Sequence, residues 1–156
     1  MLYHRLLSKS LFVFATLVLA QVSHAQTLTV VEELDFGQAV VTDNSSQYSV
    51  NIQANGNYSA DSVFIFLQVP SEGVYQFDGL PVSTAISNIS ITVDQQMIGP
   101  GEDFIIDNFD IDAPSSTSPI GELEVRLGAR MRTTGSSQQY LHNSDYDSVL
   151  TITITY

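Results

Sequence analysis

The end of the chain alternates between two kinds of side chain with a strict period of two. Positions 151, 153 and 155 are threonine, and the positions between and after them are apolar. These apolar residues are Leu150, Ile152, Ile154 and Tyr156. Such alternation in β-branched and aromatic residues predicts a β-strand with one face in a core and the other in solvent. The chain therefore ends in a strand, although terminal residues are commonly poorly ordered.

Similar segments recur along the chain, separated by glycine, proline and asparagine. We expect further strands within residues 27–37, 48–54, 62–70, 73–78, 86–94, 104–112 and 121–133. Segment 62–70 is nearly all apolar, which predicts burial of both its faces, and Gly128 marks an expected bulge. No segment shows helical periodicity over ten residues. About eight or nine short antiparallel strands predict an all-β, immunoglobulin-like (pilin-like) β-sandwich.

The first 25 residues have the character of a secretory signal peptide. Arg5 and Lys9 precede an apolar run over residues 10–20, and Ser23 and Ala25 stand at the small positions before a cleavage site. The run is shorter than the roughly 20 residues that cross a bilayer as a helix, although an uncleaved anchor is the alternative. We expect cleavage after Ala25, no membrane insertion afterwards, and one mature domain over residues 26–156.

The expected mature chain is strongly acidic. It has 17 carboxylates against three arginines, a formal charge of −14. This charge argues against nucleic acid and anionic membranes as partners. Glu122 and Glu124 precede Arg126, Arg130 and Arg132 with matching alternation, which predicts exposed cross-strand ion pairs. The chain has no cysteine, so stability has to come from the core and the strand ladders.

Few residues of the mature chain suit catalysis, and we expect no enzyme activity. His142 is the one histidine after the leader, in a loop with Asp145 and Asp147. No serine stands in the context of a nucleophile elbow. A glycosidase-type carboxylate pair would need a cleft and a buried, protonated carboxyl, which nothing in the sequence marks. We therefore expect no catalytic residue and no cofactor.

The acidic segment DNFDID raises the question of a metal site. Its carboxylates Asp107, Asp110 and Asp112 offer oxygen ligands of the kind that calcium prefers, but without the spacing of an EF-hand. In an unbroken strand, Asp110 and Asp112 share a face and Asp107 points away. We expect a solubilising face and no metal site, with calcium binding as the alternative.

Four segments resemble, in order, those of small secreted bacterial β-domains. ELDFGQAVV (residues 33–41) resembles their LDFG element, and SDYDSVLTITITY (residues 144–156) resembles their Tyr-terminated closing strand. YQFDGLPVSTAISNISIT and GELEVRLGARMRT resemble the strands between. Over residues 27–156 the chain is similar to a family known as a domain of unknown function. It is more distantly similar to the spore-coat-U-like domain and to subunits of archaic chaperone–usher pili.

This resemblance implies a function for the final strand. Pilin-type domains lack one strand of the sandwich, which leaves a groove that a periplasmic chaperone fills before a like subunit donates its N-terminal extension. Leu150, Ile152 and Ile154 would line this groove, and Tyr156 would lie where the chaperone contacts the terminus. The resemblance thus implies a secreted, non-catalytic structural or adhesion-type subunit of a fimbria. Its expected location is the periplasm or cell surface of a Gram-negative bacterium.

Two features depart from these pilins. The spore-coat-U-like pilins usually carry cysteines, and this chain has none. Only the eight residues 26–33 precede Leu34, and their pattern suits a first core strand better than a donor extension. The alternatives are a complete domain whose final strand lies inside a sheet, and a stand-alone extracellular domain that binds glycan or calcium.

Overall fold

The computed structural model describes residues 26–99, 101–140 and 145–156. The expected signal peptide (residues 1–25) and His142 lie outside these residues. Ten strands are found: β1 (Thr27–Glu32), β2 (Gln38–Val41), β3 (Ser49–Ile52), β4 (Tyr58–Ala60), β5 (Phe64–Gln68), β6 (Gly73–Asp78), β7 (Asn88–Ile98), β8 (Ile105–Asp112), β9 (Leu123–Arg132) and β10 (Asp147–Thr155). Every strand pair among them is antiparallel, which confirms the all-β class. The two strands missing from the prediction are the short β2 and β4.

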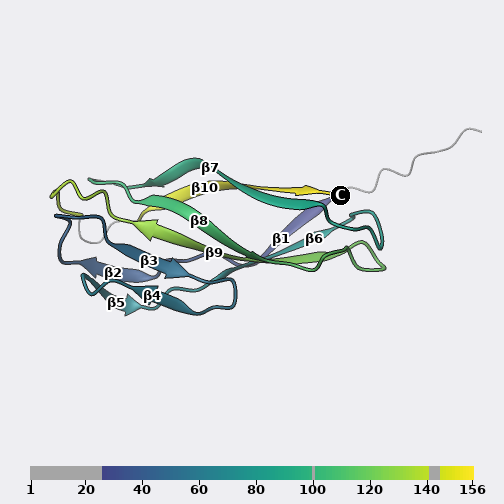
Figure 1. Cartoon of the computed structure of the whole chain (residues 1–156), viewed down its shortest axis with the longest axis horizontal. Coiled ribbons are helices and arrows are strands. Elements are labelled where there is room, and N and C mark those ends of the chain that lie inside the picture. Colours follow the sequence, from purple (N-terminus) through teal and green to yellow (C-terminus); the bar gives the residue numbers. More distant parts are fainter. Residues whose placement is uncertain (1–25, 100, 141–144) are drawn as a thin grey trace, which may run out of the picture.

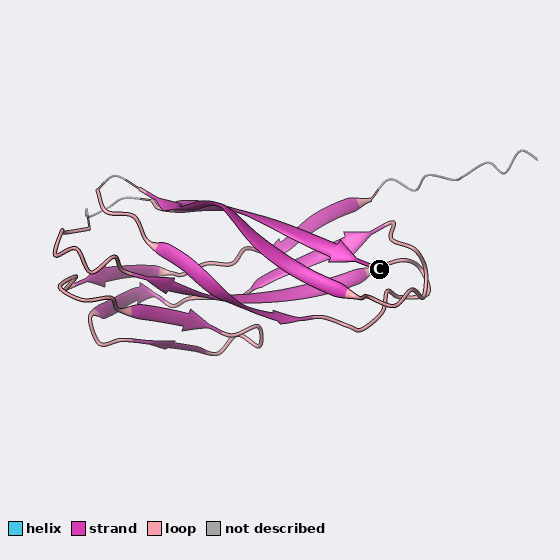
Figure 2. Ribbon diagram, turned by 45° about the horizontal axis from the view of Figure 1, so that its top comes forward, coloured by secondary structure: helices cyan, strands magenta, loops and turns pink. Residues whose placement is uncertain are grey.

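The regular structure of the described residues is strand alone, as Figure 2 shows. They contain no helix of the length and apolar character that crossing a membrane requires. The absence of helix follows from the period-two patterning, because alternating apolar residues cannot line one face of a helix.

Strand β9 is the centre of the main sheet (Figure 1). Strand β8 pairs along one of its edges; along the other, β6 pairs with its first half and β3 with its second half. The sheet continues from β6 to β1 and from β3 to β4. The sequence of β9 suits this central place, because its inner face is apolar and at most 5% exposed throughout. These inner residues are Leu123, Val125, Leu127, Ala129 and Met131.

Two two-stranded ribbons pack against the main sheet and complete a β-sandwich. Ribbon β7–β10 contributes Ile89 and Ile154 to a cluster around Leu123 and Val125. Ribbon β2–β5 contributes Phe64 and its neighbours to a second cluster, which contains Val50, Met131 and other residues of the main sheet. The sandwich therefore has two adjoining cores, one under each ribbon.

The prediction that segment 62–70 is buried on both faces is wrong. Phe64 is only 7% exposed, but Ile65 and Leu67 are 54% and 71% exposed. Among the described residues β5 pairs only with β2, so the ribbon buries one face against the core and leaves the other in solvent. An apolar run does not by itself distinguish a strand covered on both faces from one at the surface.

A bulge in β8 changes which aspartates share a face. Between Asp107 and Asp110 the register with β9 shifts by one residue, and Asn108 has a φ of 51°. The extra residue turns Asp107 onto the same outer face as Asp110 and Asp112, so the prediction that it points away from them is wrong. The bulge also lies in β8, opposite Gly128, and not in β9 as predicted.

Candidate functional site at the edge of the final strand

Strand β10 lies at the edge of its sheet. It pairs with β7 from Asp147 to Thr155, and no strand of the described residues pairs along its other edge. The peptide N–H and C=O groups on that edge can therefore accept another strand. Of the two positions that the sequence left open for the final strand, inside a sheet or at an edge, the structure has the edge.

The residues predicted to form the partner-binding edge share the inner face of β10. Leu150, Ile152 and Ile154 are half-buried, whereas the threonines between them are exposed. Each of the three pairs with a β-branched residue of β7 (Val93, Ile91 and Ile89, respectively). Tyr156 follows the strand, is 48% exposed, and accepts a hydrogen bond at its hydroxyl from Gln26 Nε2 at 3.0 Å. The predicted alternation is thus present, while the partner-binding role stays a prediction.

Strand β1 lies across from the end of β10 and also has an uncovered inner face. Leu28 pairs with Phe77, which pairs with Leu123, so the three side chains point to the same side of the main sheet. Exposure in this row changes from 2% at Leu123 to 53% at Leu28. Val30, two residues further along β1, is 49% exposed. The inner face of the main sheet therefore loses its cover toward β1.

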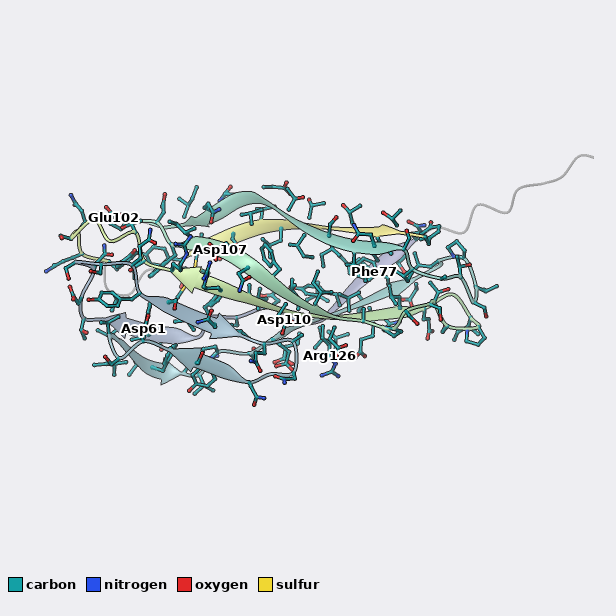
Figure 3. All side chains as sticks on the ribbon, in the orientation of Figure 1. Asp61, Phe77, Glu102, Asp107, Asp110 and Arg126 are labelled. Atoms are coloured by element: carbon teal, nitrogen blue, oxygen red, sulfur yellow. The ribbon has the colours of Figure 1, made fainter. Side chains whose placement is uncertain are left out.

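The two uncovered strands run in opposite directions along one side of the molecule. Figure 1 shows β1 starting beside the end of β10, and β2 lying toward the end where β10 begins. A hollow of about 290 Å³ separates the end of β10 from β6; its lining includes Phe77, Leu80 and Ile152. Figure 3 labels Phe77 in the space between the β7–β10 ribbon and the main sheet. We call this side, with β1 and β2 on one wall and β10 on the other, the open side.

A larger hollow of about 690 Å³ lies at the other end of the open side, between β2 and the residues that lead into β10. Its apolar lining includes Phe36, Phe64, Met97, Phe104, Met131, Tyr140 and Tyr146. Three acidic residues, Asp35, Asp145 and Asp147, also line it. The hollow thus combines an aromatic floor with an acidic rim.

Three aromatic rings hold this floor in place. Phe104 stacks on Tyr140 with ring centroids 4.1 Å apart, and the ring of Tyr146 meets Phe104 edge-on at 5.1 Å. Tyr146 lies so close to Gly99 that a Cβ there would be 2.3 Å from its ring. Burial raises the pKa of Tyr140, and its hydroxyl accepts a hydrogen bond from the Thr134 amide at 3.1 Å. The floor is therefore a packed, neutral aromatic surface.

The opposite side of the sandwich is closed by the β7–β8 hairpin. Met97 and Phe104 form a β-bridge, and the amide of Ile106 donates to the Gln96 side-chain oxygen at 2.7 Å. A side chain of β7 thereby satisfies a backbone donor at the edge of β8. The two layers are connected on this side and separate on the open side.

Two aspartates of the acidic segment DNFDID accept hydrogen bonds from other residues of the protein. Asp107 accepts from Arg130 Nε at 2.7 Å and from Arg132 Nη2 at 2.6 Å, and these bonds, Arg130 first, hold the pKa of Asp107 below its ordinary value. Asp110 accepts from the Ala54 amide at 2.9 Å. Figure 3 labels both aspartates on β8. In the part of the chain that the structure describes, no three His, Cys, Asp or Glu side chains group in a way that could hold a metal ion.

The arginines form ion pairs, but not the predicted cross-strand pairs with Glu122 and Glu124. Arg130 and Arg132 share Asp107 across the β8–β9 ladder. Arg126 pairs with Glu124 on its own strand at 3.0 Å and with Glu72 at 3.6 Å. Asp107 was not predicted to be the acceptor, because the bulge that turns it toward the arginines cannot be recognised from the spacing of residues in the sequence.

Sequence reasoning also missed the aromatic floor and the wall at β1. Phe104 and Tyr140 are far apart in the chain, and no spacing rule connects them. The pattern of residues 27–32 did indicate a strand, but not that its inner face is uncovered. Both features depend on which strand edges meet in the folded chain.

These features define an antiparallel β-sandwich domain whose final strand lies at an open edge. The chain belongs to the family described as "Domain of unknown function (DUF4402)", whose model matches residues 27–156. No curated protein and no solved structure matches the chain. The family match confirms the resemblance to a small β-domain of unknown function, and the more distant similarity to pilins stays a prediction.

Proposed function

We propose that the protein is a secreted, non-catalytic surface subunit of the fimbrial, pilin-like type that accepts a β-strand from a partner at the edge of β10. The observation that carries this proposal is that, within the described part of the chain, β10 pairs only with β7, while apolar residues on the facing wall are about half exposed. An immunoglobulin-like sandwich that lacks one strand would have this combination of an unpaired edge and an uncovered inner face.

Strand addition would stabilise the open side in two ways. Backbone hydrogen bonds to β10 supply affinity, and alternate side chains of the added strand enter the hollows. Nine residues in β10 correspond to about 30 Å of edge. Because β1 and β10 run in opposite directions, an added strand would be antiparallel to one wall and parallel to the other.

An exposed apolar edge of this length favours aggregation, so a secreted protein needs a partner on it. A periplasmic chaperone, followed by subunits of the same assembly, would meet this need. The predicted leader and the resemblance support secretion to the periplasm or cell surface of a Gram-negative bacterium. The uncovered apolar face and the leader together support this role.

The described residues favour an acceptor over a donor. Residues 27–32, the segment that would serve as a donor, form β1 and pair with β6. The alternative of a stand-alone binding domain for calcium gains no support from Asp107 and Asp110, because protein donors engage both. The proposed role is therefore that of a subunit whose open side a partner completes.

A strand-capture experiment tests the proposal. The protein, purified after expression of the full 156-residue chain, is titrated against a fluorescent nine-residue peptide that alternates threonine with valine. Ile152→Asp places an unpaired carboxylate on the inner face, so we expect at least about tenfold weaker binding. Thr153→Asp adds the same charge on the exposed face of β10 and should bind like the wild type.

Circular dichroism shows whether each variant is folded, and Ile152→Thr provides a milder change at the same position if Ile152→Asp fails to fold. Absence of peptide binding to the wild type would overturn the proposal. Equal losses for the two aspartate variants would also overturn it, because the inner face would then have no special role.

A further inference from the structure

We infer that the strand accepted on the open side carries a lysine or arginine over Asp145 and Asp147, and that it comes from a different protein. This step rests on the proposed function, because it specifies the chemistry of the strand that the edge of β10 accepts.

The larger hollow has a concentration of negative charge, and no arginine of the described residues lines it. Asp35, Asp145 and Asp147 are exposed and line the same hollow. Asp35 accepts hydrogen bonds from neutral donors, the Gly37 amide at 2.8 Å and the Gln68 side chain at 3.4 Å. The ion pairs of the described residues all use other carboxylates.

The arginines of β9 cannot neutralise the negative charge of the hollow. Arg126, Arg130 and Arg132 alternate with the buried residues of β9, so they lie on the outer face of the main sheet, and each is paired there. Like charges in one hollow repel one another, and a cation from a partner would convert this repulsion into attraction. The charge of the hollow therefore selects a cationic strand and disfavours an acidic one.

The floor of the hollow suits the rest of such a side chain. Lysine and arginine cover apolar surface with their methylene groups while the charged end stays in water. Tyr140, whose ring stacks on the buried Phe104, lines the same hollow as the acidic residues, and a cation is attracted to the face of an aromatic ring. An aromatic floor with an acidic rim therefore matches one long cationic side chain on an otherwise apolar strand.

The same observations argue against a second copy of this chain as the donor. Its first described strand is already paired with β6. Among the strands of its described residues, only β9 contains arginine, and β9 is the centre of the main sheet. The sequence after residue 25 contains no lysine and has a formal charge of −14, so two copies repel each other. With the leader removed, as the proposed function implies, a cationic donor strand comes from a different protein.

Three labelled peptides test the inference. One alternates threonine with valine and is neutral, and the other two carry a single lysine at the N-terminal or the C-terminal end, because the direction of the strand is not assumed. Affinities are measured at pH 8, where an ordinary histidine is neutral. We expect one lysine peptide to bind about three- to tenfold more tightly than the neutral one at about 0.02 M salt, and much of this preference to be lost at about 0.3 M.

The carboxylates are tested with charge-matched variants. Asp145→Asn/Asp147→Asn should abolish the preference for lysine while leaving the binding of the neutral peptide unchanged. Asp112→Asn/Glu122→Gln removes the same charge at two exposed positions, one at the end of β8 and one directly before β9, and should keep the preference. A preference that survives in the first variant would overturn the inference.

The remaining outcomes separate the inference from the proposed function. Equal affinity for all three peptides would overturn the cationic strand and leave strand acceptance intact. Failure of every peptide to bind would overturn both. Self-association of the protein without peptide, measured by light scattering and lost in Ile152→Asp, would overturn the conclusion that the donor is a different protein.

Discussion

Replacing Val30 by threonine should leave the free energy of unfolding almost unchanged, whereas the same replacement at Val125 should lower it by about 1–3 kcal/mol. The two valines belong to one row of the main sheet, because Val30 pairs with Tyr75 and Tyr75 pairs with Val125. Both face inward, and the change from valine to threonine hardly alters the volume. Only the environment of the new hydroxyl differs.

That environment sets the two magnitudes. Val125 is 0% exposed and packs in a hydrophobic cluster with Leu80 and Leu123, where a new hydroxyl would be removed from water. Val30 is 49% exposed, so its replacement stays hydrated and should change stability by less than about 0.5 kcal/mol. The comparison measures whether the inner face is covered at β1.

Urea unfolding followed by circular dichroism measures both values, with equal m-values showing that the unfolded states are comparable. The titrations are repeated at several protein concentrations, because self-association would add its own stabilisation. A loss above about 1 kcal/mol for Val30→Thr in the monomer would refute the conclusion that β1 has an uncovered inner face. A small loss at Val125 would refute a dry core at that position.

Two further changes test the sheet itself. Asp107→Asn should lower stability at neutral pH by about 1 kcal/mol, because it weakens two charged hydrogen bonds. The pKa of Asp107 is lowered in the folded state. Its contribution is therefore present above the unfolded-state pKa of about 3.9 and is lost as the pH falls through the folded-state pKa. Urea midpoints of variant and wild type should converge in acid, and a gap that persists at about pH 2 would contradict this role. Gly128→Ala should cost at least about 2 kcal/mol, since its Cβ would lie 2.2 Å from the backbone oxygen of Ile52. If the variant melts at the same temperature as the wild type, the backbone of Ile52, at the end of β3, does not lie this close to Gly128.

Much of the secondary structure was predictable because alternation is a local property of the chain. In β9 and β10, side chains at even separation share a face, so the apolar positions and the positions between them could be assigned directly. Gly56, whose φ is 81°, lies between the strands expected within residues 48–54 and 62–70, where glycine and asparagine separate them. The all-β class followed from such segments without knowledge of their pairing.

The wrong predictions concern features that depend on residues that are neighbours in space but not in the sequence. The apolar run of β5 could not reveal that only one of its faces meets the core. The bulge at Asn108 places a non-glycine residue at positive φ, and the pairing of Asp107 with two arginines follows from it. These outcomes reflect tertiary packing that overrides the local pattern.

In the candidate site, some features are determined by the sequence and others only by the tertiary structure. The sequence determined the two faces of the final strand, because faces are defined by side chains, and it determined the acidity of the chain. The structure alone decided that β10 pairs on one side and is open on the other, and that Asp145 and Asp147 lie beside an aromatic floor. The physical reason is that strand edges are made of backbone N–H and C=O groups, which nearly every residue carries alike, so only the fold determines which edges are paired.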